Sequence, residues 1–187
     1  MRSGNDTADG QALATALLGS GSERWLHVAG VAAAAASAAD GIDEREAGLL
    51  VSAAWLHDIG YATGLAHTGF HPLDGARYLR SLGAPDRLCR LVANHTGAGV
   101  EARARGLGTA LTTEFPAEVS AVADALTFAD LTTGPTGLPV TVEARLSEIL
   151  KRYEPGHVVH DSIHQAAPDL IATVRRVEAR LAAAQPR

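Results

Sequence analysis

The 187-residue chain has one cysteine, few aromatic residues and a single lysine. One cysteine, Cys89, excludes an internal disulfide framework and favours a reducing cytoplasm. Aromatic residues make up 4% of the chain, although hydrophobic residues, of which alanine is the most common, reach 47%. We therefore expect a core of helices that pack closely through small side chains, with Cys89 as a small core residue.

Basic blocks and long apolar runs are also missing. The formal net charge is −5, and the 16 basic residues, all arginine except Lys151, are scattered along the chain. No stretch therefore indicates a nucleic-acid groove. The apolar run over residues 30–36 is far shorter than the roughly 20 residues that a transmembrane helix needs, and Met1 to Asp6 lead into no apolar signal segment. We expect a cytoplasmic protein that binds neither nucleic acid nor membrane.

The spacing of apolar residues predicts helices along most of the chain, and no strand pattern or internal repeat stands out. The expected helices cover residues 7–18, 23–39, 43–58, 71–82, 85–95, 116–130, 142–153, 158–166 and 168–184, with a short one around 100–105. Glycine-rich residues 59–70 and the remainder of 97–116 are expected to be loops. The predicted fold class is all-α, a single-domain helical bundle.

The most informative stretch covers residues 54–60, Ala-Trp-Leu-His-Asp-Ile-Gly. An apolar run ends there in His57 and Asp58, and Gly60 then lets the backbone turn. Imidazole and carboxylate groups are good ligands for hard or borderline metal ions. Adjacent side chains on a helix diverge by about 100°, so the pair alone cannot surround an ion. The other ligands must come from other segments.

Four further candidate ligands lie on other predicted helices. His27 lies inside the second helix, and His71 begins the fourth. His95 ends the fifth helix, and Asp130 ends the sixth. Helical bundles build metal sites in this way, from inward-facing residues of several helices. The structural alternative is that histidines fall by chance in a helical core; taken alone, His71 could merely begin a helix and His95 could cap one.

The order of His27, the His57-Asp58 pair and Asp130 resembles the defining pattern of the HD superfamily of metal-dependent phosphohydrolases. The flanking sequences Arg-Trp-Leu-His-Val-Ala at 24–29 and Leu-His-Asp-Ile-Gly at 56–60 are typical of that superfamily. The similarity covers roughly residues 23–135, which we expect to form an HD-type metal-binding core. Residues 1–22 would form an N-terminal helix and linker, and residues 136–187 would form C-terminal helices that pack on the core.

The resemblance implies a specific set of metal ligands. His27, His57, Asp58 and Asp130 would hold a first divalent ion. Members with two metals add two histidines between the pair and the last aspartate, and His71 and His95 occupy that place. Asp58 would then bridge to a second ion. A mixed set of imidazoles and carboxylates favours Fe or Mn, and Co, Ni or Zn would also suit it.

The candidate catalytic residues are Asp58, which belongs to this set, and Arg24 and His67, which do not. Asp58 would take part directly through its metals. Arg24, one turn before His27, could contact a phosphate or form a structural ion pair. His67 could donate a proton to the leaving group or be a loop or supporting residue. Many family members have lysine after the glycine of the His-Asp-Ile-Gly sequence, whereas Tyr61 stands here, which removes an expected positive charge near the substrate.

The leading hypothesis is hydrolysis of a small phosphate ester, such as a nucleotide, by a metal-activated water molecule. The resemblance also permits a dinuclear-iron oxygenase that cleaves a C–C or C–P bond, and a binding module without turnover is the third hypothesis. A small phosphorylated molecule is the expected partner, and alanine-rich helix faces would also suit a homodimer. His157, His160 and His164 have only Asp161 beside them, so we interpret them as surface residues.

Overall fold

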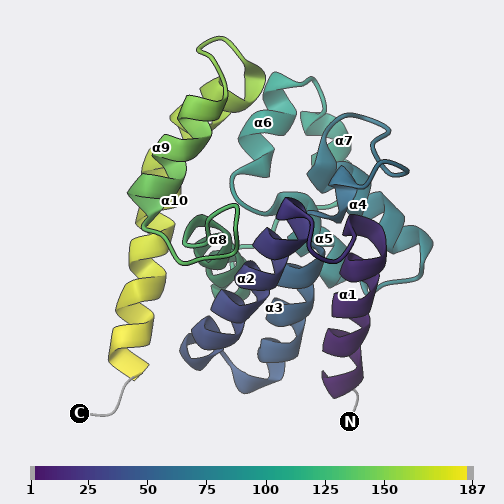
Figure 1. Cartoon of the computed structure of the whole chain (residues 1–187), viewed down its shortest axis with the longest axis vertical. Helices are drawn as coiled ribbons and strands as arrows, with labels where there is room; N and C mark the ends of the chain where they lie inside the picture. Colours follow the sequence, from purple (N-terminus) through teal and green to yellow (C-terminus); the bar gives the residue numbers. More distant parts are fainter. Residues whose placement is uncertain (1–2, 185–187) are drawn as a thin grey trace.

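The computed structural model describes residues 3–184, which contain ten α-helices, two short 3-10 helices and no β-strand (Figure 1). The predicted all-α class is confirmed. The α-helices are α1 (Ser3–Leu18), α2 (Glu23–Ala38), α3 (Glu44–Leu56), α4 (His71–Ser81), α5 (Asp86–Asn94), α6 (Ala98–Ala104), α7 (Gly108–Glu114), α8 (Ala121–Leu131), α9 (Val142–Arg152) and α10 (Val158–Ala184). The 3-10 helices are η1 (Ala39–Gly41) and η2 (Ile59–Tyr61). None of the helices in this range is both long and apolar enough to cross a membrane.

Side-chain caps set the beginnings of the helices that lead to the candidate site. Ser22 accepts a hydrogen bond from the backbone N–H of Trp25 at the start of α2. Asp43 accepts one from Arg45 at the start of α3. Each cap satisfies a backbone donor that has no partner within the helix. α4 begins at His71 with a proline in its first turn, as the sequence predicts.

Two predicted boundaries between residues 97 and 130 are wrong. Residues 108–114 form α7 rather than a loop, because Leu111 is fully buried against the core. The helix that carries Asp130 begins at Ala121 rather than at Pro116, because the hydroxyl of Ser120 accepts the backbone N–H of Ala123 at 3.1 Å and caps α8 there. Val119 just before this cap is exposed.

The predicted break at Pro168 is also wrong. α10 runs through this proline as one helix of 27 residues. A proline inside a helix costs about 3 kcal/mol or more, because it removes one hydrogen bond and clashes with the preceding turn. Pro168 is exposed, and the buried residues Ile163, Ala166 and Leu170 lie on both sides of it. Packing on both sides of the proline therefore keeps the helix continuous.

The helices are arranged with α1 and α10 on opposite sides of the molecule and with α2 and α3 between them (Figure 1). α1 packs against α3, while α10 packs against α8, α6 and α9. α4 and α5 form a pair, and α6 and α7 lie together at the same end as the start of α4. The predicted division at residues 22 and 135 stays a prediction; α1 and α10 both pack on helices of the central part.

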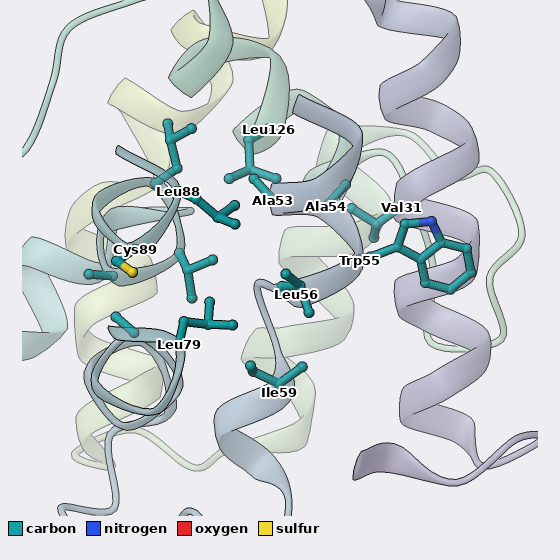
Figure 2. Close-up of a cluster of buried hydrophobic side chains, with 14 of the residues drawn as sticks. Val31, Ala53, Ala54, Trp55, Leu56, Ile59, Leu79, Leu88, Cys89 and Leu126 are labelled. Carbon is teal, nitrogen blue, oxygen red and sulfur yellow. The ribbon is translucent and has the colours of Figure 1, made fainter. Parts of the chain in front are cut away.

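The main hydrophobic core joins α2, α3, α4, α5 and α8 (Figure 2). Val31, Ala53, Leu79 and Leu126 are among its fully buried members. Cys89 also lies in this core, which confirms its predicted place. A second buried cluster links the end of α8 to α9 and α10; its members include Leu131, Val142, Leu146, Ile163, Leu170 and Val174. The two clusters hold the helices that carry the candidate site.

Candidate metal centre

The six predicted metal ligands meet in one place, although they come from five segments of the chain. They are His27 in α2, His57 and Asp58 just after α3, His71 at the start of α4, His95 just after α5, and Asp130 in α8. Five of these side chains are buried, and His71 is partly exposed. The bundle therefore surrounds the group, and His71 is its most exposed member.

Asp58 lies at the centre of the group. Its Oδ2 atom is 3.5 Å from Nε2 of His57 and 3.9 Å from Nε2 of His27. Its Oδ1 atom is 3.1 Å from Nε2 of His71 and 3.8 Å from Nε2 of His95. The two oxygens of this carboxylate therefore face two different pairs of imidazoles.

Asp130 completes the half of the site that contains His27. Its Oδ1 atom is 3.1 Å from Nε2 of His27 and 4.0 Å from Nε2 of His57. The potential ligand atoms of these three residues all lie within 4.8 Å of one another, and the same holds for His57, Asp58 and His95. Two atoms that each lie about 2.1 Å from one ion are roughly 3–3.5 Å apart. The separations in the cluster suit shared ions.

Backbone carbonyls fix the orientation of three of the imidazoles. The Nδ1–H groups donate to carbonyl oxygens, from His27 to Gly134 (3.1 Å), from His57 to Ala54 (2.8 Å) and from His95 to Val92 (2.7 Å). A carbonyl only accepts, so the proton of each neutral ring lies on Nδ1 and the lone pair of Nε2 faces the carboxylates.

The Nε2 atom of His57 is the clearest sign of a missing ligand. It is buried and has no hydrogen-bond partner among the described residues. A buried polar atom without a partner costs about 1–3 kcal/mol, and a metal ion beside it would remove that cost. Burial also lowers the pKa values of His57, His71 and His95, so these rings are neutral at pH 7 and able to coordinate. The donor set therefore fits a divalent metal.

The two carboxylates are held in the ionised form. Burial alone would raise the pKa of Asp58, but the positive charge of the Arg24 guanidinium holds it well below its usual range. Burial would likewise raise the pKa of Asp130, but the hydrogen bond that Nε2–H of a protonated His27 ring donates lowers it instead. The Thr96 hydroxyl donates to the Oδ2 atom of Asp130 at 2.5 Å. Two buried negative groups in one cluster favour a positively charged ligand.

Arg24 and Tyr61 lie at the edge of this cluster. Arg24 donates through Nη1 to Oδ2 of Asp58 at 2.6 Å, so it forms an ion pair there. Its guanidinium lies 4.2 Å from the centre of the Tyr61 ring, which in turn stacks on His71 with ring centres 4.0 Å apart. The positive charge of Arg24 therefore lies beside Tyr61, which stands where many family members have lysine.

Two glycines allow these segments to approach. A Cβ atom on Gly60 would lie 2.0 Å from the carbonyl oxygen of His71, so only glycine lets Asp58 and His71 meet across this turn. A Cβ atom on Gly30 would lie 2.4 Å from the carbonyl oxygen of Gly137. This second contact places the loop after α8 against α2, where the Gly134 carbonyl reaches His27.

Other residues singled out from the sequence lie outside the cluster. His67 is exposed in the loop before α4, and its side chain makes no hydrogen bond, ion pair or ring contact within residues 3–184, so its role as a proton donor stays a prediction. Asp74 accepts the backbone N–H of Thr68 and thereby holds that loop. His160 pairs with Asp161, and the described part of the chain has no metal-ligand group there.

The sequence reasoning missed the groups that orient the ligands. The carbonyls of Ala54, Val92 and Gly134 carry no sequence signal, because every residue has a carbonyl. Thr96 has a weak signal, since it follows His95 directly. Its φ of 44° is the only positive φ of a non-glycine residue in the described range, and such strain is common at functional sites.

A family model described as HD domain matches residues 24–154 of the chain, which include all six predicted ligands. The match covers most of the sequence, and the chain belongs to the HD-domain family. This superfamily consists in general of metal-dependent phosphohydrolases, and the clustered histidines and aspartates could bind a divalent metal. Searches of curated proteins and of solved structures found no significant match.

Proposed function

We propose that the protein hydrolyses a small phosphate ester at the six-residue cluster, with nucleotides as one candidate class of substrate. The position of Asp58 is the observation that carries this proposal. Its two oxygens lie 3.1–3.9 Å from four imidazole nitrogens, which is the arrangement expected of a carboxylate shared between two ions. The buried Nε2 of His57 supports the same interpretation.

His27, His57, Asp58 and Asp130 would hold one ion, and Asp58, His71 and His95 would hold the second. Fe or Mn is the proposed metal, because the ligands are imidazoles and carboxylates without thiolate. When bound, divalent ions lower the pKa of a water molecule and polarise the oxygens of a phosphate ester. The cytoplasmic location, the homodimer and the exclusion of nucleic-acid and membrane partners stay predictions.

The residues of the chain supply orientation and charge. The backbone carbonyls keep the imidazoles in the coordinating tautomer, and Thr96 fixes one oxygen of Asp130. Arg24 is 31% exposed at its side chain, so its outer N–H groups can reach a substrate phosphate while Nη1 holds Asp58. Planar guanidinium groups suit phosphate oxygens through paired hydrogen bonds.

The test is phosphate release from a panel of nucleoside monophosphates and simple phosphomonoesters, measured with added Mn²⁺ or Fe²⁺. We expect release by the wild-type protein and none by the Asp58→Ala variant, with far-ultraviolet circular dichroism showing that the variant remains helical. A His164→Ala variant is the matched control and should keep full activity. Turnover retained by a metal-free Asp58→Ala protein would contradict the proposal.

A dinuclear-iron oxygenase is the second candidate. The Nε2 atoms of His71 and His95 lie 3.2 Å apart beside Oδ1 of Asp58, which favours a complete second metal position. Tyr61 in place of lysine also weakens the expected phosphate contact. Oxygen consumption by the iron-loaded protein, without phosphate release from any ester of the panel, would favour this candidate over hydrolysis.

A further inference from the structure

A pocket lies next to the metal centre, on the side of α9. Its volume is about 410 Å³, and it is lined by Glu23, Arg24, His27, Pro135, Arg145, Glu148 and Arg152. His27 belongs to both places, because its ring reaches Asp130 in the cluster and also lines this pocket. A molecule bound at the metal centre could therefore extend past His27 into the pocket.

Arg145 is the unusual residue of this pocket. Its side chain is 8% exposed, although arginine is seldom so deeply buried. Nη1 donates to Oε2 of Glu148 at 2.5 Å. Its Nε–H is buried and has no hydrogen-bond partner within residues 3–184. A buried, charged donor without a partner is costly, and an anion in the pocket that Arg145 lines would offset the buried positive charge.

The charges on this side of the pocket are unbalanced. Glu148 is shared, since its Oε1 accepts from Nε of Arg152 at 3.0 Å while its Oε2 accepts from Arg145. One carboxylate thus faces two guanidinium groups, so the residues on α9 carry one surplus positive charge, while the exposed carboxylate of Glu23 lines the pocket from α2. Arg24, at the other wall, is already paired with Asp58. The chemistry of the wall formed by α9 is that of a site for an oxyanion.

We propose that this pocket binds a second anionic group of the substrate, a phosphate or a carboxylate beyond the phosphate that is hydrolysed. The inference rests on the proposed function for the substrate and on Arg145 and Arg152 for the contact. The substrate class would then be phosphate esters that carry two anionic groups, such as nucleoside diphosphates or phosphorylated carboxylic acids. Glu148 would compete with that group for the two arginines.

The binding of two matched probes tests whether the pocket holds a second anionic group, and this measurement requires no turnover. Methylphosphonate has one anionic group, and phosphonoacetate carries a carboxylate in addition. Their dissociation constants would be measured by calorimetry on the metal-loaded protein at constant ionic strength. We expect phosphonoacetate to bind about tenfold more tightly, since one charge-assisted contact is worth about a factor of ten or more. Equal affinity for the two probes overturns the proposal.

Four variants test which residues cause the preference for phosphonoacetate over methylphosphonate. Arg145→Lys and Arg152→Gln should each reduce the preference for phosphonoacetate several-fold, whereas Glu148→Gln should increase it, because the competing carboxylate is gone. Arg175→Ala is the matched control, because Arg175 is also a helical arginine, located on α10 and paired with glutamates. The preference of this variant for phosphonoacetate should equal that of the wild type. A role of Arg145 in packing alone predicts a lower melting temperature with an unchanged preference, which overturns the proposal. If Arg145→Lys does not fold, Arg152→Gln and Glu148→Gln decide.

Failure of this inference can be separated from failure of the proposed function. If the preference and its dependence on Arg145 and Glu148 are found while no ester of the panel is hydrolysed, the pocket assignment stands and the proposed activity fails. If esters are hydrolysed but the two probes bind equally, the activity stands and the pocket assignment fails.

Discussion

The chain contains two groups of histidines next to aspartates, and only one of them has the properties of a metal centre. In the central group, three rings donate Nδ1–H to backbone carbonyls and aim Nε2 at buried carboxylates. In the group near the C-terminus, His160 pairs with Asp161 at 3.0 Å and stacks on His164, but Asp161 is exposed. Proximity of histidine to aspartate is therefore not sufficient to form a metal centre. The central group differs from the outer one in the burial of its aspartates and in the backbone carbonyls that orient its rings.

Removal of a central ligand should have the largest effect. His57→Ala takes away the ring whose Nε2 faces both halves of the cluster, so we expect loss of bound metal and of phosphate release. His160→Ala removes a ring from the outer group and should change neither. Metal content and turnover, measured side by side on the two variants, check the comparison. Equal metal content in the two variants would show that the central group has no special role.

The Gly60→Ala substitution should disrupt the geometry of the central group without replacing any of the six proposed ligands. The new Cβ would lie 2.0 Å from the carbonyl oxygen of His71, so Asp58 and His71 must move apart. We expect Gly60→Ala to lower the free energy of unfolding by about 1–3 kcal/mol and to reduce metal binding. Gly64→Ala is the control, because nothing lies within 4 Å of its Cβ position. Urea denaturation of both variants measures the difference; equal stability would contradict the expectation.

Thr96 offers a smaller test of the orientation argument. Thr96→Val keeps the shape of the side chain but removes the hydroxyl that donates to Asp130. Loss of a hydrogen bond to a metal ligand typically costs about 10–100-fold in metal affinity, and we expect an effect at the low end of that range. Thr96→Ser keeps the hydroxyl and should retain the affinity of the wild type. Competition with a metal-binding dye measures this; equal affinities in the two variants would remove Thr96 from the site.

The smallest expected effect lies away from both histidine groups. Hydrogen bonds from Arg87 hold the pKa of Glu118 below its usual range. A carboxylate with a lowered pKa in the folded state stabilises the protein above the pKa of the unfolded chain, about 4.3, and this contribution disappears as the pH falls through the folded-state pKa.

Glu118→Gln should therefore lower the free energy of unfolding by about 0.2–1 kcal/mol at pH 7, because the ion pair lies near the surface. The difference from the wild type should shrink steadily below about pH 4.3. Urea denaturation at several pH values follows it. A difference that grows as the pH falls would show that the sign of the pKa shift is wrong.

The sequence selects the six residues that the fold brings together because most of them lie at the ends of periodic apolar segments, and because His27 and the His57-Asp58 pair have flanks typical of HD domains. It predicts the fold class for the same reason. It does not predict that α10 continues through Pro168, because the buried contacts on both sides of the proline exist only in the folded chain. The late start of α8 follows from the cap at Ser120, which competes with an equally plausible proline start at Pro116.

Arg145 could have been noticed from the sequence, although its partners could not. Val142, Arg145, Leu146 and Ile149 have the spacing of one helix face, so an arginine interrupts an apolar stripe. Such an arginine is either paired or functional. Its proximity to His27 depends on how α9 packs on α8, and no local pattern in the sequence carries that information.

The most direct test of the central claim is the metal content per chain of protein purified without added metal and without chelator. We predict nearly two ions per chain, mostly iron or manganese, with the metal lost in the Asp58→Ala variant. Protein that holds no metal, even after incubation with Mn²⁺ or Fe²⁺, would contradict the account, because the six residues would then form no metal centre.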